Sequence, residues 1–124
     1  MKILVTGGAG FIGSHIVDML VDRGDEVVVI DNLSTGVKEN VNDKARLLCF
    51  DRLLQVCEEE KFDAVFHEAA QTQVPYSQEH PYEDSDENVM GLLSVLEGAR
   101  KTGVKKVVFS SSAAVYGDND NLPL

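Results

Sequence analysis

The sequence has few basic residues and no apolar segment long enough to cross a membrane. Its 11 Lys and Arg residues stand against 21 Asp and Glu residues, which gives a formal net charge of −10. Such a chain repels phosphate backbones, so nucleic acid is not an expected partner. Apolar runs stay well below the ~20 residues of a membrane span, and the N-terminal run is too short for a signal-peptide core. We therefore expect a cytoplasmic protein with no membrane partner.

Cysteine and proline are also scarce, with two and three residues respectively. Cys49 and Cys57 match no metal-ligand spacing, so no metal site is expected, and a structural disulfide is not expected in a cytoplasmic chain. The composition is 44% apolar and 26% charged, which is typical of a globular protein. The 124 residues suit one domain, and no linker divides them. We expect residues 1–124 to form a single domain.

Apolar runs alternate with helix-period segments along the whole chain. Strands alternating with helices indicate a parallel sheet covered on both faces, and right-handed crossovers favour the strand order 3-2-1-4-5. We expect an α/β, doubly wound (Rossmann) sheet of five strands that is truncated after the fifth, because no further helix follows to cover it. The expected strands are 2–6, 26–31, 46–50, 63–67 and 105–111, the expected helices are 11–23, 53–61 and 81–101, and the remainder, including 69–80, is expected to be loop.

A glycine-rich segment, TGGAGFIGSH, follows the first expected strand and opens the first helix. Gly7 allows a sharp turn, bare backbone at Gly10 lets a pyrophosphate approach, and Gly13 lets the helix pack closely on the sheet. Amide groups near Phe11 and Ile12 would then face the phosphates. By itself the pattern also fits a plain tight turn, and it is not a P-loop because no Gly-Lys-Ser/Thr follows.

An acidic residue at the end of the second strand favours a dinucleotide site over a plain turn. Asp31 lies 18 residues after Gly13. A carboxylate here accepts hydrogen bonds from the ribose hydroxyls of adenosine and repels a 2′-phosphate. The nearest downstream base is Lys38, and no Arg lies nearby in the sequence to bind an extra phosphate. The order of strand, glycine loop, helix, strand and acid therefore predicts binding of NAD in preference to NADP.

Five motifs in order resemble the extended short-chain dehydrogenase/reductase family. Within it they are most similar to the NAD-dependent sugar-nucleotide epimerases and dehydratases, and among these to the UDP-glucose 4-epimerases. The resemblance covers essentially the whole chain. The motifs are TGGAGFIGSH, DNLSTG at 31–36, HEAA at 67–70, NVMG at 88–91 and SSSAAVYGD at 110–118.

The resemblance implies a site for NAD and a role for one serine in catalysis. Ser112 would hydrogen-bond the reacting oxygen of the sugar substrate. In such enzymes a Tyr of a Tyr-x-x-x-Lys motif takes the hydroxyl proton of the sugar, and the nicotinamide accepts and later returns a hydride. The residues placed around NAD by the resemblance are Gly7, Gly10, Phe11, Ile12, Gly13, Asp31, Asn32, Ser34, Thr35, Gly36, Asp51, Ala69, Ala70, Gln71, Asn88 and Ser110.

The sequence contains no Tyr-x-x-x-Lys, because His80, Asp86 and Asp120 stand four residues after its three tyrosines. The second domain of the family, which closes over the sugar nucleotide, is expected to be missing as well. Loss of a positioned acid or base costs about 10²–10⁴-fold in rate. We expect an NAD(H)-binding domain that has negligible epimerase activity alone. Alternatives are one subunit of a split epimerase, completed by a C-terminal chain, or a non-catalytic dinucleotide sensor.

Other departures from the family bear on the site and on partners. Asp51 and Arg52 run straight into the next helix, which shortens the segment expected beside the adenine. Glu68 replaces an apolar residue, and its carboxylate is expected either near the cofactor phosphates or in solvent. His67 opens an HEAA segment without the second His of a zinc motif, so it is interpreted as a loop-edge histidine. Uncovered sheet and helix surface predicts self-association.

Overall fold

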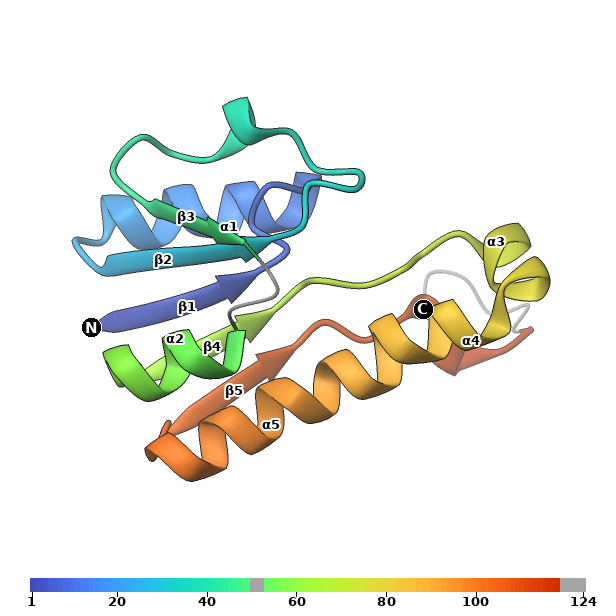
Figure 1. The fold of residues 1–124 in the computed structure, drawn as a ribbon. Coiled ribbons are helices and arrows are strands. Elements are labelled where there is room, and N and C mark those ends of the chain that lie inside the picture. Colours follow the sequence, from blue (N-terminus) through green and yellow to red (C-terminus); the bar gives the residue numbers. More distant parts are fainter. Residues whose placement is uncertain (50–52, 119–124) are drawn as a thin grey trace.

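A five-stranded parallel sheet organises the chain in the computed structural model, which describes residues 1–49 and 53–118 (Figure 1). The strand order is β3-β2-β1-β4-β5, as predicted for a doubly wound sheet. All four pairings are parallel, so the carboxyl ends of the strands share one edge. The strands are β1 (Lys2–Thr6), β2 (Glu26–Asp31), β3 (Arg46–Cys49), β4 (Ala64–His67) and β5 (Lys106–Phe109).

Helices cover the two faces of the sheet and produce two apolar clusters. Helix α1 (Phe11–Asp22) packs Val17 and Leu20 on one face, against Val5 and Val29. Helices α2 (Leu53–Glu60) and α5 (Gly91–Thr102) pack on the other face, against residues such as Leu4 and Val65. Because both faces of β1 and β2 are buried, these strands have continuous rather than alternating apolar runs. Each fully buried Val or Ile contributes about 1.5–3 kcal/mol of apolar transfer free energy.

The predicted long helix over 81–101 is interrupted. The structure has a short helix α4 (Pro81–Ser85), then a π turn η3 (Asp86–Met90), and then α5. The predicted end is correct, since the N–H of Gly103, at φ 78°, donates to the carbonyl of Ala99 at 3.0 Å. The expectation of a single regular helix is wrong because one wider turn is inserted in its middle.

A second short helix lies in a stretch that the sequence predicts to be loop. Helix α3 (Val74–Glu79) begins with Pro75 in its first turn, where the missing N–H of proline has no cost. We call α3 and α4 together, residues 74–85, the arm. In Figure 1 the arm extends beyond the edge of the sheet where the strands end.

Strand β5 forms one edge of the sheet, and one of its faces is incompletely covered. Val107 packs with the cluster under α2 and α5. Val108 and its register partner Phe66 point to the α1 face and remain partly exposed. This agrees with the prediction that strand five lacks a cover on its far side. Among the described residues, no helix is both long and apolar enough to span a membrane.

Candidate functional site

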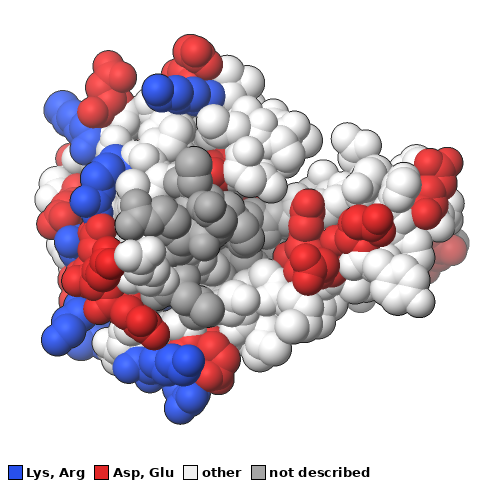
Figure 2. Space-filling model, in the orientation of Figure 1, with Lys and Arg blue, Asp and Glu red and all other residues white. Residues whose placement is uncertain are grey.

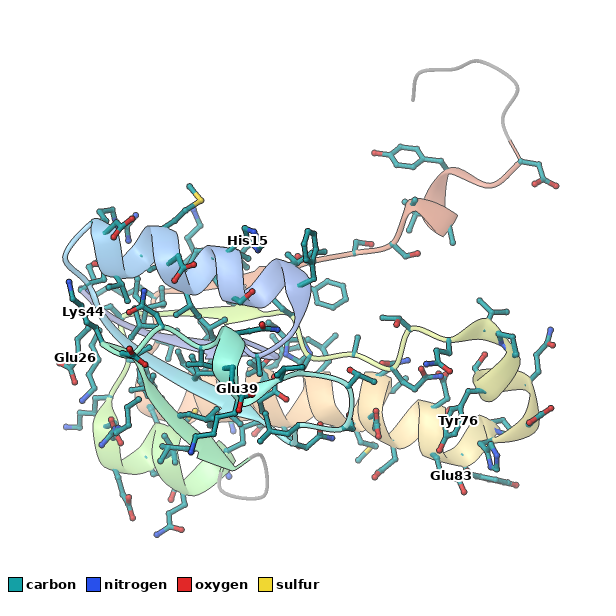
Figure 3. The ribbon with its side chains drawn as sticks, turned by 90° about the horizontal axis from the view of Figure 1, so that it is seen from above. His15, Glu26, Glu39, Lys44, Tyr76 and Glu83 are labelled. Atoms are coloured by element: carbon teal, nitrogen blue, oxygen red, sulfur yellow. The ribbon has the colours of Figure 1, made fainter. Side chains whose placement is uncertain are left out.

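A cleft of about 850 Å³ opens at the edge where the strands end. Its walls are the loops after β1, β2, β4 and β5, which is where ligands bind in doubly wound sheets. Figure 3 shows the arm, marked by Tyr76 and Glu83, and the segment after β5 projecting from this same end of the molecule. The predicted site residues that line the cleft are Gly7, Gly10, Phe11, Ile12, Gly13, Asp31, Asn32, Ser34, Thr35, Gly36, Ala69, Ala70, Gln71, Asn88, Ser110 and Ser112.

One predicted residue, Asp51, which was expected beside the adenine, lies outside the described residues. Besides His67 and Glu68, five lining residues had no predicted role: Thr72, Glu87, Phe109, Ser111 and Ala113. Each of them lies within a predicted motif or within two residues of one. Proximity to the motifs was therefore a usable signal for them.

The glycine loop is held between the ends of β2 and β4. Gly7 has φ 70°, and its N–H donates to the carbonyl of Ile30 at 2.8 Å. A Cβ on Gly7 would lie 2.6 Å from the backbone nitrogen of Ala69. Both the left-handed backbone and this close approach require glycine.

Gly13 and Gly10 differ in what surrounds them. A Cβ on Gly13 would lie 2.2 Å from the carbonyl oxygen of Gly7. The close approach at Gly13 is therefore between the start of α1 and the glycine loop, whereas the prediction placed it between the helix and the sheet. At Gly10 the nearest atom to an added Cβ is the same oxygen at 3.3 Å, and φ is −79°. A methyl at Gly10 would thus make one tight contact, with the Gly7 carbonyl, which is much milder than the overlap at Gly13, and Gly10 lines the cleft.

Helix α1 begins in the cleft. Its first backbone hydrogen bond runs from the N–H of Ser14 to the carbonyl of Gly10 at 3.0 Å. The N–H groups of Phe11, Ile12 and Gly13 precede that bond and have no partner within the helix. Such a helix start attracts anions through its free N–H groups and its dipole.

Asp31 closes the cleft on the β2 side and is 9% exposed. Its Oδ2 accepts from the N–H of Ala9 at 2.9 Å, and its Oδ1 accepts from the N–H of Leu33 at 2.8 Å. From the sequence, the carboxylate of Asp31 was predicted only to bind ribose hydroxyls. Its hydrogen bonds to the backbone of the glycine loop and of the loop after β2 were not predicted. A carboxylate has about four acceptor positions, so both oxygens retain capacity for a ligand.

The loop after β2 is fastened to the glycine loop through Ala9. The carbonyl of Ala9 accepts from the N–H of Val37 and from Nδ2 of Asn40, each at 3.1 Å. Gly36 packs so closely that a Cβ on it would lie 2.8 Å from the Cβ of Ala9. Within the loop, the N–H of Ser34 donates to Oδ1 of Asn32 at 3.0 Å. These contacts give the adenosine side of the predicted site a defined wall.

His67 is the last residue of β4, and it is buried rather than at a loop edge. Its Nδ1 lies 2.7 Å from Oγ1 of Thr6, and its ring stacks on Phe109 with centroids 5.9 Å apart. Burial lowers the pKa of His67 below its usual value, so the ring is neutral at physiological pH. The N–H of Ala69 donates to the same Thr6 hydroxyl oxygen at 3.3 Å. His67 therefore organises the β4 end of the cleft.

Glu68 lines the cleft, and one of its carboxylate oxygens is buried. The sequence left its position open between the cofactor phosphates and solvent. The structure makes Glu68 a lining residue and buries its Oε1, which has no hydrogen-bond partner among the described residues. A buried carboxylate oxygen without a donor is costly.

The serine segment after β5 completes the wall. The N–H of Ser110 donates to the carbonyl of His67 at 3.4 Å, which holds the segment beside β4. Ser112 precedes the short 3₁₀ turn η4 (Ala113–Tyr116), and its Oγ accepts from the N–H of Ala114 at 3.1 Å. The hydroxyl hydrogen of Ser112 is left to donate elsewhere.

The cleft is acidic. Its described lining includes Asp31, Glu68 and Glu87, and no Lys or Arg. Figure 2 shows Asp and Glu side chains, without Lys or Arg, on the visible face of the arm, and the sequence from 62 to 99 has no basic residue other than histidine. An anionic ligand would therefore depend on backbone amides and the α1 dipole within this lining. The described residues also contain no group of three or more His, Cys, Asp or Glu suited to a metal ion.

The cleft and the motifs around it match a known family. A profile of the "NAD dependent epimerase/dehydratase family" matches residues 3–124. The chain belongs to the NAD-dependent epimerase/dehydratase family. NAD is the cofactor of this family, and the sequence-based resemblance is confirmed.

Individual relatives are UDP-glucose 4-epimerases. The enzyme of Lacticaseibacillus casei is 43% identical over 129 residues, which cover 100% of this chain and 39% of that protein. A Thermotoga maritima UDP-glucose 4-epimerase solved with UDP-glucose is 43% identical, with a TM-score of 0.91, over 98% of this chain and 41% of that one. A Thermus thermophilus UDP-glucose 4-epimerase in complex with NAD is 44% identical, with a TM-score of 0.84, over 90% of this chain and 38% of that one. The chain thus spans about two fifths of these relatives.

Proposed function

We propose that residues 1–124 form an NAD(H)-binding domain of a sugar-nucleotide epimerase that acts on UDP-sugars. The observation that carries the proposal is the convergence of the glycine loop, the start of α1 and Asp31 on one cleft. The relatives supply the substrate class, because one is solved with UDP-glucose and another with NAD.

The residues in the cleft fit NAD in three places. The N–H groups that open α1 would hold the pyrophosphate, and Gly10 beside them presents no side chain to the cleft. The adenosine ribose donates to the remaining acceptor positions of Asp31, whose charge repels the 2′-phosphate of NADP. The loop over residues 32–36 closes this side. When bound, NAD supplies reversible hydride transfer.

The catalytic contribution of these residues is partial. We propose that the hydroxyl of Ser112 donates to the reacting oxygen of the sugar. The sequence has no Tyr-x-x-x-Lys, and therefore no tyrosine whose pKa a nearby lysine could lower for proton transfer. A polypeptide of these 124 residues is therefore expected to bind the cofactor and to show negligible epimerisation.

A split enzyme is the second candidate. The partly exposed pair Phe66 and Val108 leaves apolar surface on the α1 face that a complementing C-terminal chain could cover. Such a chain would also supply the missing Tyr and Lys. If no complementing chain exists, a domain that binds NAD(H) without catalysis would be a dinucleotide sensor. Turnover of UDP-glucose restored on mixing with the complementing chain separates the split enzyme from the sensor.

Calorimetric titration of NAD and NADP into the purified chain tests the binding. We expect a micromolar Kd for NAD and at least about tenfold weaker binding of NADP, equivalent to about 1.4 kcal/mol. Asp31→Asn should reduce the ratio of the Kd for NADP to the Kd for NAD. Gly10→Ala should weaken the binding of both NAD and NADP without unfolding the protein. Asp22→Asn, which alters an exposed acid outside the cleft, should leave both Kd values unchanged. Absence of binding by the wild-type chain would refute the proposal, and measurable epimerisation would refute the inactivity.

A further inference from the structure

Leu33, in the loop after β2, has a backbone conformation that leucine rarely adopts. Its φ is 56°, in the left-handed region where the Cβ of an L-residue crowds the following carbonyl oxygen. Glycine and asparagine tolerate this region better than leucine does. Across residues 31–37, all of which the structure describes, only Leu33 has a positive φ. The conformational cost is therefore concentrated at one residue of this loop.

The side chain of Leu33 gains little that could offset this cost. It is 42% exposed, and it belongs to neither of the two apolar clusters. The neighbouring residues Asn32 and Ser34 line the cleft, whereas Leu33 does not. A leucine selected for burial or for ligand contact would show one of these features. The reason for its conformation therefore lies in its backbone.

The carboxylate of Asp31 holds the backbone of Leu33. The N–H of Leu33 donates to Oδ1 at 2.8 Å, and Oδ2 of the same carboxylate accepts from the N–H of Ala9 at 2.9 Å. A hydrogen bond to an ionised carboxylate is stronger than one between neutral groups, so it can maintain a mildly unfavourable conformation. One carboxylate thus fixes both the glycine loop and the left-handed residue beside it.

The segment from Asp31 to Val37 is fastened to the same residue, Ala9, at both of its ends. Asp31 accepts from the N–H of Ala9, and the N–H of Val37 donates to the carbonyl of Ala9 at 3.1 Å. The chain must therefore leave the end of β2 and return to the glycine loop within a few residues. Positive φ angles are a usual means of changing direction in tight turns, and Leu33 contributes one here. The residues on either side of it, 32 and 34–36, line the cleft.

We propose that Leu33 is a positioning residue for the adenosine half of the cofactor. Its left-handed backbone, held by Asp31, fixes the loop over residues 32–36 in one conformation before the ligand arrives, so that binding does not have to order this loop. The inference rests on the proposed NAD site and adds to it a residue that does not line the cleft. The restraint favours affinity, and its cost falls on the stability of the free protein.

Two substitutions of Leu33 test the assignment, with the Kd of ADP and the urea midpoint measured for each. ADP carries the adenosine half of the cofactor. Leu33→Gly removes both the conformational cost and the restraint, so the Kd of ADP should rise about three- to fivefold while the urea midpoint does not fall. Leu33→Asn adopts the left-handed region more readily than leucine and is less free than glycine, so it should bind ADP as tightly as the wild type.

Lys61→Gly is the matched control. Lys61, at φ 49°, is the other non-glycine residue with a positive φ in the part of the chain that the structure describes. It is exposed, follows the end of α2 and lies outside the cleft lining. The substitution releases the same kind of backbone restraint away from the cleft. The Kd of ADP should therefore stay at its wild-type value, and the urea midpoint should again not fall.

The outcomes separate this inference from the proposed function. If Leu33→Gly binds ADP as tightly as the wild type, the loop needs no restraint and the assignment is wrong. If Leu33→Asn weakens binding as much as Leu33→Gly, the site needs the leucine side chain rather than its backbone, which also overturns the assignment. A urea midpoint that falls together with the affinity of Leu33→Gly would show a merely structural role and overturn it as well.

In each of these cases the wild-type chain still binds NAD and ADP, and the NAD site stands. If the wild-type chain binds neither ligand, the proposed function fails together with the inference.

Discussion

The side-chain amide of Asn88 forms hydrogen bonds with both the N–H and the carbonyl of Gln71. Its Oδ1 accepts from the Gln71 N–H at 2.8 Å, and its Nδ2 donates to the Gln71 carbonyl at 3.0 Å. The same Nδ2 lies 3.1 Å from Oδ1 of Asp84. Asn88 stands in the π turn η3, so the widened turn and the β4 loop are joined by one side chain.

Asn88→Asp should be more harmful than the small change in shape suggests. The aspartate loses the donor to Gln71 and places a second carboxylate beside Asp84. We expect the free energy of unfolding to fall by about 1–3 kcal/mol at pH 7. Urea titration gives this value. Asp84→Asn in the same chain should recover part of the loss, whereas additive effects of the two changes would contradict the contact.

Gly13→Ala should destabilise the fold much more than Gly10→Ala. The added methyl at Gly13 overlaps the Gly7 carbonyl, and overpacking of this kind costs about 1–3 kcal/mol or more. At Gly10 the methyl meets one neighbouring atom, the Gly7 carbonyl oxygen at 3.3 Å, so a small shift accommodates it and the loss in the free energy of unfolding should stay at about 0.5 kcal/mol. Denaturant unfolding of both variants measures the difference. Equal losses would show that the two glycines have the same structural role.

The stability of the protein should decrease as pH falls below 6.5 because of His67. Burial lowers the pKa of His67 in the folded state below the usual histidine value of 6.5, so the ring is mostly neutral in both states well above that pH. Below it the unfolded chain binds the proton first, which favours unfolding by at most about 1.4 kcal/mol per pH unit. Urea midpoints between pH 8 and pH 5 should show this slope. His67→Leu should reduce the slope while lowering stability at pH 8 through loss of the Thr6 contact.

An apolar stripe on α4, η3 and α5 should cause self-association. Tyr82, Val89, Leu93 and Leu96 follow one side of these turns and are 88%, 62%, 48% and 45% exposed. Exposed apolar surface of this extent favours pairing with a second surface. Sedimentation analysis should show a mass that rises with protein concentration, and Leu93→Glu should reduce that rise. Met19→Glu, which alters an exposed apolar residue on α1, serves as the control; equal effects would place the contact elsewhere.

The strands were predictable because local and global requirements agree there. Runs such as KILVT and EVVVID are β-branched, and a glycine or an acid ends them. Their bounds in the structure lie within two residues of the predicted ones, and the order follows from the handedness of the crossovers. The glycine loop was also predictable from local sequence, because the spacing of its glycines indicates both a tight turn and the start of a helix.

The missed features depend on contacts between distant residues. The π turn at 86–90 interrupts an otherwise regular helical pattern where Asn88 reaches Gln71, and periodicity contains no sign of that contact. The bond from Ala9 to Asp31 crosses 22 residues and is equally invisible to local reasoning. Helix α3 is different, because Pro75 near its start was a readable signal in a stretch interpreted as loop.

The central place of β1 in the sheet has a consequence for protein synthesis. Of the five strands, β1 is synthesised before the others, and its partner β4 follows only at residues 64–67. At about 5–20 residues per second, the β4 edge of β1 waits for several seconds before its partner exists. During that interval KILVT presents an open, apolar strand edge, the kind of surface that pairs with other nascent chains. The same topology that gathers the cleft around β1 thus leaves one edge of this strand unpaired until β4 has been synthesised.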